Sequence, residues 1–83
     1  MNIERDVTQI LSAANDSVSL INGVNDGSWN VEGMEQSEIN DMVQRNVDHL
    51  EIILAYEEVV ADSSDKSSYN SAISTGKAYI AAH

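Results

Sequence analysis

Apolar residues recur at alternating three- and four-residue steps along most of the chain, and this period restricts the fold more than any other feature of the sequence. The spacing places side chains on one face of an α-helix. Residues 3–21 carry the first such stripe, which consists of Ile3, Val7, Ile10, Ala14, Val18 and Ile21. Asn22-Gly23 follows, and Gly23 is suited to the left-handed conformation that ends many helices. The spacing therefore predicts a helix over residues 3–21.

A second and longer helix is predicted over residues 37–61. Ser37 is suited to its N-cap, because its side-chain oxygen can accept a hydrogen bond from an early backbone amide. At 100° per residue this segment has two apolar faces. Ile52, Tyr56 and Val59 form the second face, at steps of four and three residues. The broad face consists of Ile39, Met42, Val43, Val47, Leu50, Ile53, Leu54 and Val60.

The polar segment over residues 62–68 predicts a turn and supplies N-cap candidates for a third helix, which is predicted over residues 68–81. Tyr69, Ile73, Gly76 and Ile80 share one stripe of that helix, where Gly76 would let a neighbouring helix approach closely. Residues 1–83 are thus expected to form a single small all-α domain. It is either a three-helix bundle or a helical hairpin, with a long central helix and a turn-rich connection after the first helix.

The two-faced central helix raises the question of what covers its second face. The first helix can cover the broad face, and the third is short and only moderately apolar. If the third helix covers Ile52, Tyr56 and Val59, the protein can be a monomer. If it does not, a second copy or another protein must cover them. These three residues are the predicted protein interface. Trp29, the only Trp, either closes the end of the bundle or serves as a second interface anchor.

Charge and composition exclude several classes of function. Four basic residues against fourteen acidic ones give a formal net charge of −10, which phosphate backbones and anionic lipid headgroups repel. Direct nucleic-acid and membrane binding are therefore not expected. The absence of Cys excludes disulfides and thiolate chemistry. A chain of 83 residues also has a thin stability margin, which close helix packing or oligomerisation can widen.

No motif predicts catalysis, a metal or a cofactor. Aligning Gly27 with the invariant glycine of a calcium loop puts Val24 and Gly33 where oxygen ligands are required. His49 has no second ligand at helical spacing, and His83 is the last residue. An enzyme is not expected. Asn46 lies within the broad face, where it is either hydrated at the edge or buried to fix the helix register.

Residues 46–55, NVDHLEIILA, and residues 72–80, AISTGKAYI, resemble small acidic helical proteins of tailed bacteriophages, of the marine cyanophage type. The resemblance covers the second half of the chain, and the family has no assigned function. It implies a viral origin and a location in the virion or the host cytoplasm. The expected function is a non-enzymatic structural or assembly protein, either a virion-associated or a connector-type subunit, which contacts its own copies or other virion proteins through its helices.

The alternative is an acidic phage inhibitor of a host protein, one form of which is a mimic of a nucleic acid. In that case the function would depend on exposed carboxylates, which would present negative charge to a basic partner. The residues expected to supply them are Asp41, Asp48, Glu51, Glu58 and Asp62.

Overall fold

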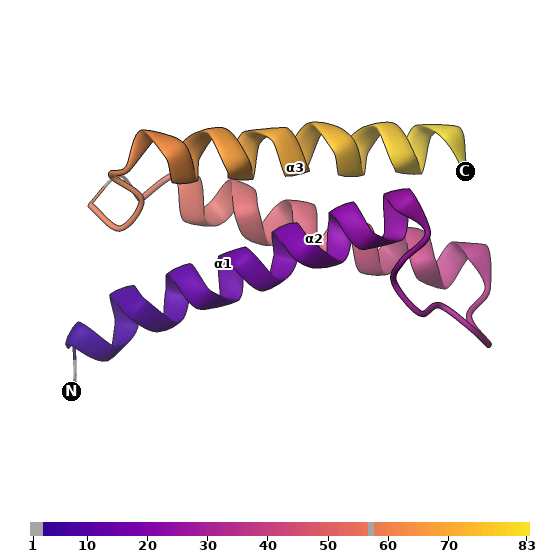
Figure 1. Ribbon diagram of the computed structural model, residues 1–83, viewed down its shortest axis with the longest axis horizontal. Coiled ribbons are helices and arrows are strands. Elements are labelled where there is room, and N and C mark those ends of the chain that lie inside the picture. The colour runs from indigo at the N-terminus through magenta and orange to yellow at the C-terminus, as the bar shows by residue number, and fades with distance from the viewer. Residues whose placement is uncertain (1–2, 57) are drawn as a thin grey trace.

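Three helices pack side by side in the computed structural model, which describes residues 3–56 and 58–83, with side chains from residue 7 onward and without that of residue 57. The helices are α1 (Ile3–Asp26), α2 (Gln36–Leu54) and α3 (Ser63–Ala82), and each contacts the other two. Figure 1 shows α2 running antiparallel to both neighbours, so that the two chain ends lie at opposite ends of the bundle. The prediction of an all-α fold is confirmed, in its three-helix form. The side chain of Ile3 lies outside the described residues.

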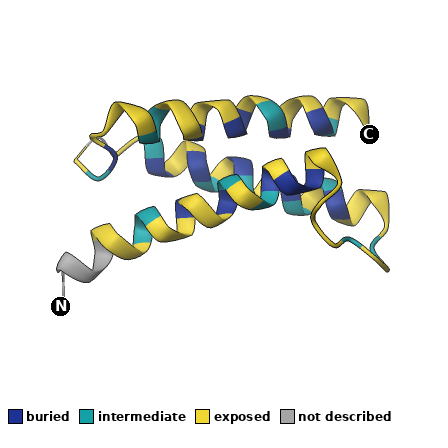
Figure 2. Cartoon of the chain, in the orientation of Figure 1, coloured by how far each residue is buried: buried dark blue, intermediate teal, exposed yellow. Residues whose placement is uncertain are grey.

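The core lies where the apolar stripes of the three helices meet, as the buried residues in Figure 2 show. Ile21 of α1 and Val43 and Val47 of α2 surround Gly76 of α3. A Cβ atom added to Gly76 would lie 2.5 Å from Val47 Cγ2, so the close approach predicted for this glycine is confirmed. The buried apolar residues are Ala14, Ile21, Val24, Ile39, Val43, Val47, Leu50, Ile53, Val60, Tyr69, Ala72, Ile73 and Tyr79.

The first helix continues beyond Gly23, where it was predicted to stop, and ends at Asp26. Gly23 is buried inside the helix, because its missing side chain leaves room for Trp29: an added Cβ would lie 3.2 Å from Trp29 Cβ. Gly27, with φ of 87°, takes the left-handed conformation instead. The Asp26 carboxylate accepts a hydrogen bond from the Ser28 amide at 2.8 Å. Hydrogen bonds from Ser28 hold the pKa of Asp26 below its ordinary value.

The second helix begins before Ser37, so the prediction of this serine as N-cap is wrong. Glu35 is the N-cap residue, and Ser37 is exposed in the first turn. The physical reason is the side chain of Glu38, which accepts a hydrogen bond from the Glu35 amide at 2.8 Å. An acidic side chain in the first turn also faces the positive end of the helix dipole.

The reversal between α2 and α3 lies earlier in the chain than predicted. α2 ends at Leu54 and not near residue 61, and the segment over 62–68, predicted as a turn, forms the start of α3. The cause is Asp62, whose carboxylate accepts hydrogen bonds from the amides of Ser64 at 2.7 Å and Asp65 at 3.2 Å. This N-cap starts α3 at residue 63, so the chain must reverse before it. Val60 lies in that reversal, yet it is buried in the core.

Candidate protein-binding groove between α1 and α2

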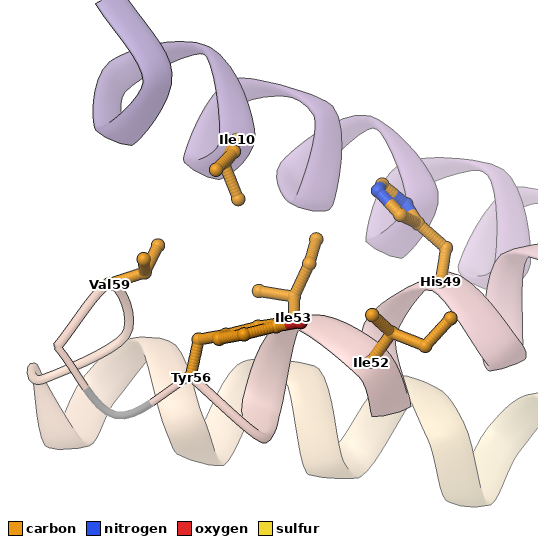
Figure 3. Close-up of a pocket in the computed structure, with 6 residues that line it drawn as sticks. All are labelled: Ile10, His49, Ile52, Ile53, Tyr56 and Val59. Carbon is orange, nitrogen blue, oxygen red and sulfur yellow. The ribbon is translucent and has the colours of Figure 1, made fainter. Parts of the chain in front are cut away.

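The predicted interface residues Ile52, Tyr56 and Val59 lie together around one apolar pocket (Figure 3). The pocket has a volume of about 320 Å³ and is lined by Ile10, His49, Ile52, Ile53, Tyr56 and Val59. Figure 3 shows Ile10 reaching into it from α1, opposite Ile53 and Tyr56. Val59 lies in the turn after α2 and not on the helix, but it still lines the pocket, because that turn folds back toward α1.

The third helix leaves this pocket uncovered. Ile52 is 60% exposed and Tyr56 is 54% exposed, the two highest values among the exposed large apolar side chains of the described residues. Glu51, the residue before Ile52, forms an ion pair with Lys77 of α3 at 2.9 Å. Because successive side chains on a helix point about 100° apart, Ile52 is directed away from α3. The sequence left open whether the third helix covers this face of the central helix. In the structure α3 does not cover it.

A polar network joins α1 to α2 beside the pocket. Ser17 Oγ, on a side chain that is 3% exposed, lies 2.8 Å from Asn46 Oδ1 and 2.9 Å from His49 Nδ1. Asn46 Nδ2 donates to the Met42 carbonyl at 2.8 Å, and this fixes the orientation of the amide. Asn46 is thus half-buried and hydrogen-bonded on both sides.

The network also determines which nitrogen of His49 carries the proton. The Ser17 hydroxyl has one hydrogen, which it donates to Asn46 Oδ1. Ser17 Oγ can therefore only accept from His49, so Nδ1 is the protonated nitrogen of the neutral ring. Nε2 then has a free lone pair. All buried side-chain nitrogens and oxygens among the described residues have a hydrogen-bond partner.

Trp29 lies at the far end of the same helix pair. Its amide donates to the Gly23 carbonyl at 3.0 Å and its ring packs over Gly23, while the side chain remains 40% exposed. It therefore both closes the end of the bundle and presents an apolar surface. The second pocket has a volume of about 470 Å³ and is lined by Ala13, Asp16, Ser17, Ser19, Leu20, Trp29, Asn46 and His49.

The two pockets are neighbouring hollows on the surface between α1 and α2, because His49 lines both of them. We call this feature the α1–α2 groove. It has an apolar end at Ile52 and Tyr56, a polar middle at the Ser17–Asn46–His49 network, and a second apolar end at Leu20 and Trp29. The structure thus places all four predicted interface residues along one surface, with Trp29 at the opposite end from the other three.

Two lining residues were not predicted as interface residues. Ile10 was assigned to the core stripe of the first helix, and only the packing of α1 against α2 brings it to the pocket. His49 was considered only as a metal ligand, and that role was rejected. It precedes Ile52 by three residues and Tyr56 by seven, so the same helical spacing extended toward the N-terminus predicts it.

Comparisons of the chain with protein-family models, curated proteins and solved structures find no match. Within residues 3–56 and 58–83, no group of three or more His, Asp or Glu side chains is placed to hold a metal ion. None of the described helices is long and apolar enough to cross a membrane.

Proposed function

We propose that this chain is a non-enzymatic structural or assembly protein of a tailed bacteriophage, acting through protein contacts at the Ile52 end of the α1–α2 groove. The observation that carries the proposal is the exposure of Ile52 and Tyr56, 60% and 54%, beside an apolar pocket. Large apolar side chains that gather at a concave surface are typical of protein contacts. The phage origin is supported by the resemblance of residues 46–55 and 72–80.

The proposed partner is a second copy of the chain or another virion protein, met in the virion or the host cytoplasm. Both partners would bury the same surface. Burial of Ile52 and Tyr56 would also add to the stability of a small domain, since each fully buried apolar side chain contributes about 1.5–3 kcal/mol. The free chain lacks this contribution, because both side chains are more than half exposed.

Light scattering across a range of protein concentrations, at low and high salt, tests for the second copy. We expect an oligomer that persists at high salt, because apolar contacts are not screened. Ile52→Asp should abolish the association. It should leave the helix content unchanged, because a side chain that is 60% exposed contributes little to the core. Ser74→Asp, at an exposed position of α3, is the matched control and should leave both properties unchanged.

Mass spectrometry of purified phage particles tests for the other virion protein. If the chain is a monomer at every concentration, its presence in the particle, lost with Ile52→Asp, supports a heterologous contact. A monomeric chain that is also missing from particles contradicts the structural role.

The acidic inhibitor is the second candidate, and the surface charge favours it. Asp41, Asp48 and Glu58 are exposed, and Lys77–Glu51 is the ion pair found among the described residues. Asp62 is exposed but its carboxylate caps α3. Binding of a host protein through these acids should weaken steeply as salt rises, and Asp41→Asn with Asp48→Asn should weaken it further. Binding that is insensitive to salt contradicts this candidate.

A further inference from the structure

We infer that the chain can exchange α3 with a second copy of itself, by straightening the connection between α2 and α3 into one continuous helix. In the exchanged dimer each α3 would pack on α1 and α2 of the other copy, through the contacts that the single chain makes with its own α3. The inference goes beyond the proposed function, because it uses the core face of α1 and α2 and not the surface around Ile52.

The connection between α2 and α3 reverses the chain without the residues that usually make a reversal. Residues 55–62, AYEEVVAD, contain no Gly and no Pro. Every positive φ among the described residues belongs to Gly27 or Gly33, which lie in the other connection. Backbone with negative φ can join a right-handed helix without a left-handed residue in the way. The α2–α3 connection can therefore straighten, whereas the α1–α2 connection turns at two left-handed glycines, which are poor helix formers.

Part of this connection already has helical geometry. The Ala55 backbone is in the right-handed helical conformation, with φ of −72° and ψ of −14°. The Val60 amide donates to the Tyr56 carbonyl at 3.1 Å, which is the four-residue step of an α-helix. The Val59 amide donates to the same carbonyl at 2.9 Å, the tighter three-residue step. Straightening thus changes a short stretch of backbone and leaves α2 and α3 as they are.

The apolar spacing runs through the reversal as if the helix continued. Ile52, Tyr56 and Val59 follow one another at steps of four and three residues. Val60 follows Ile53 by seven residues, or two helical turns. This spacing predicts a helix up to residue 61, and the structure reverses the chain there instead. The single chain thus overrides a local preference for helix, which the exchanged dimer would satisfy.

The face that α3 would leave identifies its new occupant as another α3. Val47, Val43 and Ile21 lie so close to Gly76 that an added Cβ would be 2.5 Å from Val47 Cγ2. A helix that fills this place therefore needs a glycine in the same register, and α2 has none. The α3 of a second copy brings this glycine together with Tyr69, which is fully buried at this face.

Two residues hold the reversal closed in the single chain. The Asp62 carboxylate accepts from the amides of Ser64 at 2.7 Å and Asp65 at 3.2 Å. A continuous helix would give these amides backbone carbonyls instead. Val60, at 1% exposure, anchors the reversal in the core. The contacts among the three helices are the same in both forms, so the connection and the protein concentration decide which form is populated.

A pair of thiols can report which α3 lies beside which α2, because the chain has no Cys of its own. Glu51 of α2 and Lys77 of α3 form an exposed ion pair at 2.9 Å. Chains with Glu51→Cys are mixed with chains with Lys77→Cys, unfolded in urea, refolded at high or low protein concentration, and treated with a short bifunctional thiol reagent. The double variant, refolded at low concentration, is the positive control, since both thiols then lie in one chain.

Ala78→Cys in place of Lys77→Cys is the matched negative control, because Ala78 is exposed and points about 100° away from Lys77. We expect the two single variants to be cross-linked after refolding at high concentration. The yield should fall at least about tenfold when refolding is done at about a hundredfold lower concentration, since a dimer dissociates by mass action. Light scattering should give twice the chain mass for the cross-linked fraction.

Variants of the connection test the mechanism of exchange. Ala61→Pro should abolish the cross-link and leave the monomer folded. Proline interrupts a continuous helix, whereas Ala61 is exposed in the single chain and its amide donates to no described backbone carbonyl. Asp62→Ala should raise the dimerisation constant by about tenfold or more, because two chains lose a cap that only the closed form uses. Ser17→Ala is the control, since it weakens the same contact in both forms and should leave the constant unchanged.

Three results would overturn the inference: no cross-link between the single variants at any concentration, a cross-link that persists in Ala61→Pro, or equal effects of Asp62→Ala and Ser17→Ala on the dimer. The proposed function fails in a different way, because the exchanged dimer should survive Ile52→Asp. If Ile52→Asp abolishes association and no cross-link forms, the inference fails and the structural role stands. A cross-linked dimer in a chain that neither associates through Ile52 nor enters particles supports the exchange and contradicts the structural role.

Discussion

Gly76 of α3 packs directly against Val47 of α2, so closely that a Cβ atom on Gly76 would lie 2.5 Å from Val47 Cγ2. Val43 and Ile21 are also close, each 3.3 Å from that position. Real Cβ atoms essentially never approach a neighbour at 2.5 Å, so a side chain at residue 76 forces either the Val47 side chain or α3 itself to shift. The packing of the three helices therefore depends on this one glycine.

Gly76→Ala should lower the free energy of unfolding by about 1–3 kcal/mol, because overpacking a core strains its neighbours. This would occur although Ala favours a helix over Gly by about 1 kcal/mol. Urea denaturation measures the change. Ser74→Ala, on the exposed side of the same helix, should change stability by less than about 0.5 kcal/mol. In a double-mutant cycle with Val47→Ala, the two changes should not be additive, and additivity would contradict the contact.

Ser17→Ala should lower the free energy of unfolding by about 1–3 kcal/mol, because Asn46 Oδ1 and His49 Nδ1 both lose their partner. Ser12→Ala, at an exposed position of α1, is the control. Nitrogen chemical shifts of His49 give a second measurement. The neutral ring should carry its proton on Nδ1 in the native protein and lose that preference in Ser17→Ala. A proton on Nε2 in the native protein would contradict the assigned network.

Asp62→Ala should cost about 1 kcal/mol of stability, because it removes the N-cap of α3. Its carboxylate accepts from two backbone amides, of which the Ser64 amide is the nearer at 2.7 Å. Ser37→Ala, which removes the residue that the sequence predicts as N-cap of the second helix, should change stability by less than about 0.5 kcal/mol. Thermal or urea unfolding of the pair measures both. Equal losses would mean that Ser37 also caps a helix.

Stability should fall as pH rises through the ionisation of Tyr69. Burial raises the pKa of Tyr69 above its ordinary value of 10.0, and the charge of Asp65 raises it further. Above pH 10 the unfolded chain therefore loses this proton before the folded chain does. The unfolded state then binds fewer protons, so the free energy of unfolding decreases with pH.

Unfolding measured between neutral pH and strongly alkaline pH tests this expectation. Tyr69→Phe should flatten the decrease, because it removes the ionising group and gives up only a long hydrogen bond, 3.3 Å, to Asn15 Oδ1. Asp65→Asn should flatten it less, since the charge of Asp65 is the smaller cause of the raised pKa. An unchanged slope in Tyr69→Phe would assign the alkaline loss of stability to other groups.

The apolar spacing was sufficient to predict the three helices and most of the core, because helix packing buries the stripes that the spacing creates. Val43, Val47, Leu50 and Ile73 were all predicted on such stripes and are all buried. The helix ends were predicted less well. Asn22-Gly23 matches the local pattern of a helix end, but the helix continues through it. Gly23 is there for its contact with Trp29, a tertiary contact that no local pattern contains.

The candidate site could be predicted in part, because the helical spacing of apolar residues is visible in the sequence. Ile52 and Tyr56 stand out because they share a second apolar face of the predicted central helix, although the sequence left open whether the third helix covers that face. Ile10 could not be assigned, since a residue on a core stripe reaches a surface pocket only through the packing of α1 against α2. The Ser17–Asn46–His49 network joins residues about thirty positions apart, beyond any helical period.

The two connections of the bundle offer unequal places for joining other molecules to the chain. Val60 is 1% exposed, so the connection between α2 and α3 is tied to the core at this residue. Glu32 and Gly33 are exposed in the other connection, and the space beside Gly33 is open for at least 4 Å. A tag, a fluorophore or a whole domain inserted at Glu32 would therefore leave the three helices in place, whereas the same insertion at Val60 would open the core.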